Sequence, residues 1–170
     1  TLIVFANYAL DRVADISAQR DQQQMAHAMS GLTDELRMQL GAVTYWDEAV
    51  RHTVFTPNAA WLHQHVGAWL MVNFAVDDVY ILDHHRKLIY AGRNGKIDQS
   101  HQWQTIAPLA APLMRAAQQK LAKAGHTVTG GAITTARGPD AADVALLNGQ
   151  PVLLVAGAVV PDTGRFSIPV

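Results

Sequence analysis

Two aromatic rings and two carboxylates stand next to one another at Tyr45, Trp46, Asp47 and Glu48. A carboxylate between large rings suits a small-ligand pocket, because the rings exclude water and strengthen a polar contact to the acid. Asp47 would then receive a cationic or hydroxyl group, with Tyr45 and Trp46 as walls, and an ammonium over a ring gains about 0.5–2 kcal/mol. In the alternative, Trp46 packs in the core and Asp47 accepts hydrogen bonds from backbone donors at a helix start. The residues themselves leave both interpretations open.

Further candidates for lining the same pocket follow along the chain. They are Trp61, Trp69, Asn73, Tyr80 and Tyr90. Rings of this size also fill protein cores, so each has a packing alternative. Asn73 stands in an apolar context, where a buried amide must find hydrogen-bond partners in the backbone or in a ligand.

The histidines and the remaining polar residues do not form a catalytic or metal-binding pattern. His63 and His65 are two apart and His84 and His85 are adjacent, which differs from the i, i+4 pair that presents two imidazoles from one helical face. We therefore interpret them as solvated surface histidines. The chain has no cysteine and no phosphate-cradling glycine loop or nucleophile elbow. The sequence thus predicts no catalytic residues, no metal site and no cofactor.

Composition points to one folded domain. The chain has 170 residues, of which 49% are hydrophobic and 16% are charged, and its formal net charge is −1. These values suit a globular domain with a substantial core. A chain without a basic field is not expected to bind nucleic acid.

The elements around these residues begin with a long N-terminal helix. Apolar residues recur every three or four positions, at Met25, Met29, Leu32, Leu36, Leu40 and Val43. This is an amphipathic stripe, whereas residues 17–24 are polar on every side, as in a segment that crosses solvent or pairs with a partner. We interpret the apolar run over residues 2–6 as the end of a membrane helix; the alternative is a helix start that packs on the body.

The rest of the chain reads as a mixture of helices and strands. Helices are expected over 46–54, 59–70 and 106–124, with Gly125 ending the last. Strands are expected over 79–82, 88–91, 127–136, 143–147 and 152–160, with an Asn-Gly turn at Asn148-Gly149. Alternation along the first of these strands puts Tyr80 and Leu82 on one face. This order predicts an α+β fold, in which an antiparallel PAS-like sheet carries helices on one face.

The sequence resembles the CHASE group of extracytoplasmic sensory domains, most closely its fourth type, over roughly residues 10–165. The resemblance rests on the long helix that runs into Tyr45-Trp46-Asp47-Glu48, on Trp69 and Asn73, and on the runs 79–83, 88–91 and 148–156. The sequence departs from the pattern at His84-His85, where a glycine-containing turn is common. Such domains sit between two membrane helices of bacterial signalling receptors, on the periplasmic side. They pass a ligand or envelope signal to a cytoplasmic diguanylate cyclase, cyclic di-GMP phosphodiesterase or histidine kinase.

The resemblance implies a single periplasmic sensor domain. Residues 1–42 would form the stalk helix, 43–165 the PAS-like core, and 166–170 the start of a path to a second membrane helix. The expected partners are a small molecule, such as an amine, amino acid or organic acid, and a second copy joined through the N-terminal helix. Two alternatives remain: a protein-interaction module without a small-molecule pocket, and a small-molecule enzyme on an α+β scaffold.

Overall fold

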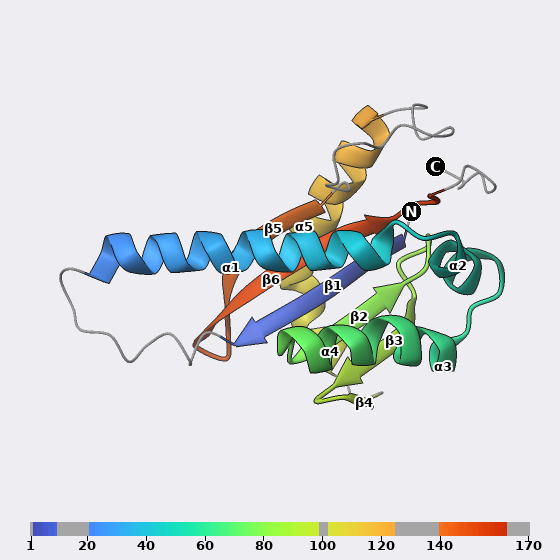
Figure 1. Ribbon diagram of the computed structural model, residues 1–170, viewed down its shortest axis with the longest axis horizontal. Helices are drawn as coiled ribbons and strands as arrows, with labels where there is room; N and C mark the ends of the chain where they lie inside the picture. The colour runs from blue at the N-terminus through green and yellow to red at the C-terminus, as the bar shows by residue number, and fades with distance from the viewer. Residues whose placement is uncertain (1, 10–20, 99–101, 125–139, 163–170) are drawn as a thin grey trace.

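The computed structural model describes residues 2–9, 21–98, 102–124 and 140–162 (Figure 1). These residues form one antiparallel six-stranded sheet, with the strand order β4-β3-β2-β1-β6-β5. The strands are β1 (Leu2–Ala9), β2 (Asp78–Leu82), β3 (Leu88–Arg93), β4 (Lys96–Ile97), β5 (Asp140–Leu147) and β6 (Gln150–Val159). The α+β class and the antiparallel sheet predicted from the sequence are confirmed.

The turns between neighbouring strands follow the predicted chemistry. Asn148 and Gly149 both have positive φ, +53° and +81°, in the two-residue turn between β5 and β6. Asn94 and Gly95 do the same between β3 and β4, at +48° and +76°. Positive φ at both central residues matches the twist of the flanking strands, and Asn-Gly adopts it with little strain. The predicted hairpin between β2 and β3 is also present, whereas residues 125–139, including the expected strand over 127–136, lie outside the described residues.

The N-terminal strand differs from the prediction. Residues 2–9 form β1 at the centre of the sheet, paired with β2 through Ala6 and Val79 and with β6 through Ala6 and Val155. The expected helix over 1–42 is therefore wrong for this segment, and residues 10–20 lie outside the described part. An apolar run without periodicity is compatible with a buried strand or a buried helix. Residues 2–9 pair with two neighbouring strands, and this pairing shows that the run is a strand.

The long helix α1 (Asp21–Thr44) packs along β6 through the predicted stripe. Leu36, Leu40 and Val43 are buried, whereas Met29 and Leu32 are partly buried at the edge of the same core. A glycine permits the close approach, since a Cβ at Gly157 of β6 would lie 2.9 Å from Leu40 Cδ2. None of the described helices is long and apolar enough to cross a membrane.

Helices cover both faces of the sheet, not one as predicted. On the first face lie α1 and a series of short helices; α5 (Gln102–Ala124) lies on the second (Figure 1). Val79 and Ile81 of β2 join the core under α1, whereas Tyr80 and Leu82 join the core under α5. The predicted alternation along this strand is confirmed, and both of its faces are apolar because both are covered.

The short helices form two continuous stretches, each containing a π-helical turn. The first stretch consists of α2 (Asp47–Val50) and η2 (Arg51–Phe55). The second consists of α3 (Ala59–Leu62), η3 (His63–Gly67) and α4 (Ala68–Phe74). The Asn58 side chain starts the second stretch by accepting a hydrogen bond from the Trp61 N–H, at 3.0 Å. Helices predicted over 46–54 and 59–70 are thus present, and the π-helical turns were not foreseen.

Candidate functional site

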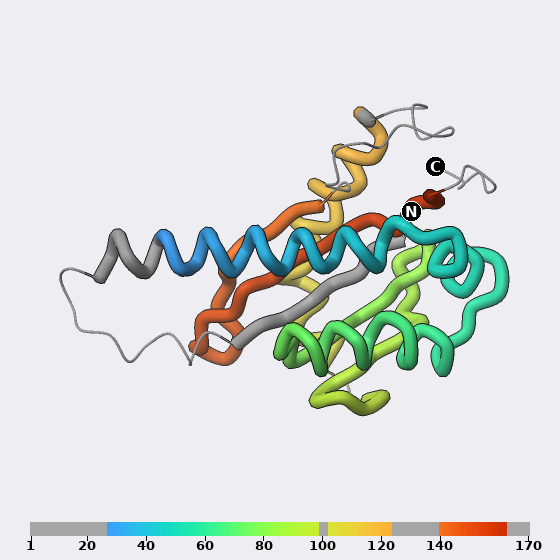
Figure 2. Tube along the Cα trace, viewed as in Figure 1, coloured from blue at the N-terminus to red at the C-terminus, as the bar shows by residue number. Residues whose placement is uncertain are grey.

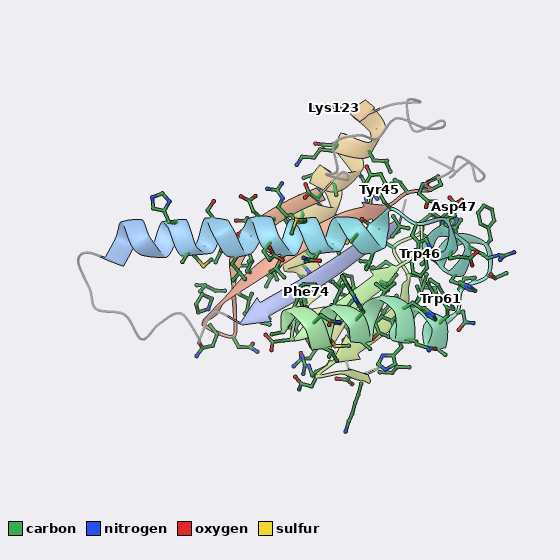
Figure 3. The ribbon with its side chains drawn as sticks, viewed as in Figure 1. Tyr45, Trp46, Asp47, Trp61, Phe74 and Lys123 are labelled. Carbon is green, nitrogen blue, oxygen red and sulfur yellow. The ribbon has the colours of Figure 1, made fainter. Side chains whose placement is uncertain are left out.

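Four rings from the short helices form a cluster beside the end of α1, which we call the aromatic–histidine cluster. It consists of Trp46 and Trp61, which are labelled in Figure 3, and of His52 and His65. The Trp61 indole stacks with two imidazoles: the ring centroids of His52 and His65 both lie 4.4 Å from it, with interplanar angles of 27° and 15°. Trp46 tilts against Trp61 at 4.9 Å. Three rings of the protein therefore contact Trp61.

Helix geometry explains part of this arrangement. Trp61 and His65 are four residues apart on one helical stretch, so their side chains lie on the same face. His65 Nδ1 is also 3.0 Å from the Trp61 carbonyl oxygen. His52 reaches the cluster from η2, in the preceding stretch. The π-helical turns at η2 and η3 each carry one of the two stacking histidines, and such turns recur at functional sites.

Polar groups at the cluster include the Glu48 carboxylate and the imidazole nitrogens of His52. The Glu48 carboxylate lies 3.6 Å from His52 Nε2 and 3.5 Å from Arg51 Nη1. His52 Nδ1 is buried and has no hydrogen-bond partner among the described residues. Buried polar atoms are usually paired with protein, water or a bound group. In the tautomer whose Nε2–H faces Glu48, Nδ1 would accept a hydrogen bond from an N–H or O–H group.

A second polar pair lies on the same side of the sheet, between β3 and η3. The Tyr90 hydroxyl is 2.9 Å from His63 Nδ1. Burial raises the pKa of Tyr90 to about 12. His63 and His65 are thus half-buried and hydrogen-bonded, so the prediction that they are solvated surface residues is wrong. It is confirmed for His84 and His85, which are exposed.

Tyr45 and Asp47 flank Trp46 but contact different partners. Burial raises the pKa of Tyr45, and the negative charge of Asp140 raises it further. The Asp47 carboxylate accepts a hydrogen bond from the Asp162 N–H at 3.1 Å.

The remaining candidates are distributed over both faces of the sheet. Trp69 packs edge-on against Phe74, with ring centroids 4.8 Å apart. Asn73 is exposed and donates to the Trp69 carbonyl oxygen, so its expected burial is wrong. Tyr80 lies on the α5 face, where its ring is 5.3 Å from Trp103, and burial raises its pKa. The structure brings Trp46, Trp69 and Tyr90 to one face and separates Tyr80 from them.

Sequence reasoning missed His52 and misassigned His65. The i, i+4 spacing of Trp61 and His65 was a usable signal for a stacked pair. No comparable signal marks His52, because its neighbours come from another helical stretch. In the described part of the chain, no group of three or more His, Cys, Asp or Glu side chains is placed to hold a metal ion.

Comparison with known families places this geometry in context. A family model of the CHASE4 domain matches residues 28–168. The chain belongs to the CHASE4 family. CHASE4 domains are extracellular sensory domains of signalling receptors and are not catalytic, in agreement with the resemblance read from the sequence. No curated protein and no solved structure matches the chain.

Proposed function

We propose that this CHASE4 domain is the periplasmic, ligand-sensing part of a transmembrane receptor. It passes a small-molecule or envelope signal to a cytoplasmic output, for which a diguanylate cyclase or a cyclic di-GMP phosphodiesterase is the first candidate and a histidine kinase the second. Two copies pair through the N-terminal helix. Family membership supports the sensory role, and the resemblance supports the output class.

The unsatisfied His52 Nδ1 carries the ligand-binding part of the proposal. The same imidazole presents its other nitrogen, Nε2, to the Glu48 carboxylate, which is 44% exposed, and stacks with the indole of Trp61. An N–H or O–H group of a ligand would donate to Nδ1, and an ammonium group of the ligand would pair with the exposed Glu48 carboxylate. Because three rings of the protein already contact Trp61, the ligand would contact the edge of the cluster at Trp46, Glu48 and His52.

In this site the ligand is held by Glu48 and His52, whereas the sequence points to Asp47. One Asp47 oxygen is already hydrogen-bonded to the Asp162 backbone, so Asp47 supports Trp46 and does not itself hold the ligand. Tyr90 and Trp69 belong to the core on the same face of the sheet, outside the aromatic–histidine cluster. Tyr80 has no part in it, because the sheet lies between.

A thermal-shift screen of amines, amino acids and organic acids on the 170-residue chain tests the proposal. At least one amine or amino acid is expected to raise Tm. His52→Ala should abolish that rise, whereas the matched variant His84→Ala, in an exposed loop, should retain it. A screen without any stabilising compound, or a rise that survives His52→Ala, contradicts the site.

A protein partner is the second candidate, favoured by two apolar side chains on β5. Val144 and Leu146 are 46% and 67% exposed. They share one face of β5, which is the edge of the sheet in the described part of the chain. Exposed apolar side chains on an edge strand suit binding of another protein. Lysine substitution of both would remove such binding without changing a ligand-induced thermal shift.

A further inference from the structure

The chain segment between α1 and α2 pairs with the end of β6. The Val160 N–H donates to the Thr44 carbonyl oxygen at 2.9 Å, and the Trp46 N–H donates to the Val160 carbonyl oxygen at 3.2 Å. Trp46 is extended, with φ −162° and ψ 122°, which allows this short parallel pairing. The trace shows α1 and β6 ending next to one another, beside α2 (Figure 2). We call residues 44–47 and 160–162 the α1–β6 junction.

Two aspartates close the junction reciprocally. The Asp47 N–H donates to Asp162 Oδ1 at 3.2 Å, and the Asp162 N–H donates to Asp47 Oδ1 at 3.1 Å. Each carboxylate therefore satisfies the backbone of the other residue. The same geometry brings two like charges close together, and their repulsion opposes the hydrogen bonds.

Trp46 belongs to the junction and to the aromatic–histidine cluster at once. Its backbone N–H holds the Val160 carbonyl, while its ring packs against Trp61 and lies 6.2 Å from His65. A displacement of the ring by a bound group would move the backbone that holds β6. Thr44 and Val160 are each 1% exposed, so the buried part of the junction has no room to absorb such a movement.

We propose that the α1–β6 junction couples the aromatic–histidine cluster to the end of β6. A change in the packing of Trp46 weakens the hydrogen bonds at Val160 and Asp162 and frees the chain beyond β6. The inference rests on the proposed sensory function, since it names the path by which that site acts. Coupling of this kind needs one element with two arrangements, and the proposal assigns that role to the junction, closed or open.

Hydrogen exchange on the 170-residue chain tests the coupling without any ligand. Trp61→Leu removes the ring that supports Trp46, and Trp69→Leu is the matched control, since Trp69 packs against Phe74 instead. In Trp61→Leu the amides of Trp46, Val160 and Asp162 should exchange roughly tenfold faster. In Trp69→Leu they should exchange as in the parent chain. Equal exchange in both variants overturns the proposal.

Further variants distinguish a loss of coupling from a simple loss of the fold. His65→Leu removes a ring at the edge of the cluster and should accelerate the same three amides, while the Tyr80 amide in β2 stays protected. Because coupling is reciprocal, Asp162→Ala should change the near-ultraviolet circular dichroism of the tryptophans. Asp162→Asn keeps an acceptor oxygen and should restore the parent spectrum. A spectrum that is the same in all three chains contradicts the coupling.

The two proposals fail in different ways. If the three amides respond to Trp61→Leu while no compound raises Tm, the junction stands and the small-molecule site is wrong. If an amine raises Tm through His52 while the amides ignore Trp61→Leu, the site stands and the coupling is wrong.

Discussion

The Tyr90 hydroxyl lies 2.9 Å from His63 Nδ1 and fills a slot between two glycines on different elements. A Cβ at Gly67 of η3 would lie 2.1 Å from this hydroxyl oxygen, and one at Gly92 of β3 would lie 2.0 Å from it. Tyr90 is 2% exposed. The phenol therefore fixes the distance between the π-helical turn and the sheet, and both glycines are required by that contact.

Gly67→Ala should destabilise the domain by about 1–3 kcal/mol, since the buried Tyr90 ring must move to admit the methyl group. Gly31→Ala is the matched control. A Cβ at Gly31 on α1 meets nothing within 4 Å, and the change should stabilise the helix by about 0.5–1 kcal/mol. Urea unfolding measures both variants. A Gly67→Ala domain as stable as the parent would show that Tyr90 does not fill the slot.

Tyr90 should make stability fall at alkaline pH. Its pKa in the fold is about 12, whereas an ordinary tyrosine has a pKa of 10.0. The stabilisation is complete below the unfolded pKa and is lost as the pH rises through the folded pKa, because only the unfolded chain releases the proton at first. In Tyr90→Phe, the loss of stability between about pH 9 and about pH 11 should be smaller than in the parent. Tyr45 and Tyr80 have raised pKa values too, so a residual loss is expected.

Arg37→Ala should cost about 1–3 kcal/mol, because the buried Asp140 carboxylate loses two hydrogen bonds while Lys120 Nζ remains 3.7 Å from its Oδ1. Arg37 Nε and Nη2 donate to the two Asp140 oxygens at 2.9 and 3.0 Å, and Asp140 is 6% exposed. Lys120 of α5 donates to the Asp140 carbonyl oxygen, so one residue of β5 joins helices from both faces.

The control for this change is Arg51→Ala. Arg51 pairs with Glu48 at 3.5 Å, and both side chains are largely exposed, so its loss should cost less than about 1 kcal/mol. Thermal unfolding at low and high salt distinguishes the two pairs. The Arg37 effect should persist at high salt, whereas any Arg51 effect should vanish. Equal costs for the two variants would show that Asp140 is not held by Arg37.

Asp47→Asn should leave Tm unchanged or slightly raised. The asparagine Oδ1 still accepts from the Asp162 N–H, while one of two facing charges disappears. Asp47→Ala should lower Tm by removing the acceptor. An Asp47→Asn chain that keeps its fold but loses the thermal shift caused by an amine would restore Asp47 as the ligand anchor and contradict the role given to His52.

Local features of this fold could be read from the sequence because they depend on local physics. The turn at Asn148-Gly149 needs positive φ, which few residues adopt as readily. The apolar stripe of α1 indicates which positions face the core, and Leu36 and Leu40 are buried as expected. The family was also recognisable, because the runs that carry the resemblance coincide with the end of α1 and with the strands β2, β3 and β6.

The missed features depend on contacts between distant segments. The strand β1 carries no periodic pattern, and only its pairing with β2 and β6 makes it a strand. His52 enters the aromatic–histidine cluster because two helical stretches meet, and Asn73 is exposed because α4 ends at Phe74. Residue type indicated that rings and carboxylates gather near Trp46. Their neighbours followed from packing, which spacing alone does not encode.

The placement of Tyr80 and Tyr90 on opposite faces bears on how such domains diversify. Each face of the sheet has its own apolar core, and the two faces are joined through the strands and through the contacts of Asp140 with Arg37 and Lys120. Substitutions around Tyr90, Trp46 and the short helices can therefore accumulate without repacking α5 against Tyr80. The α5 face can therefore keep its packing, and with it the stability of the fold, while substitutions on the other face change what the domain binds.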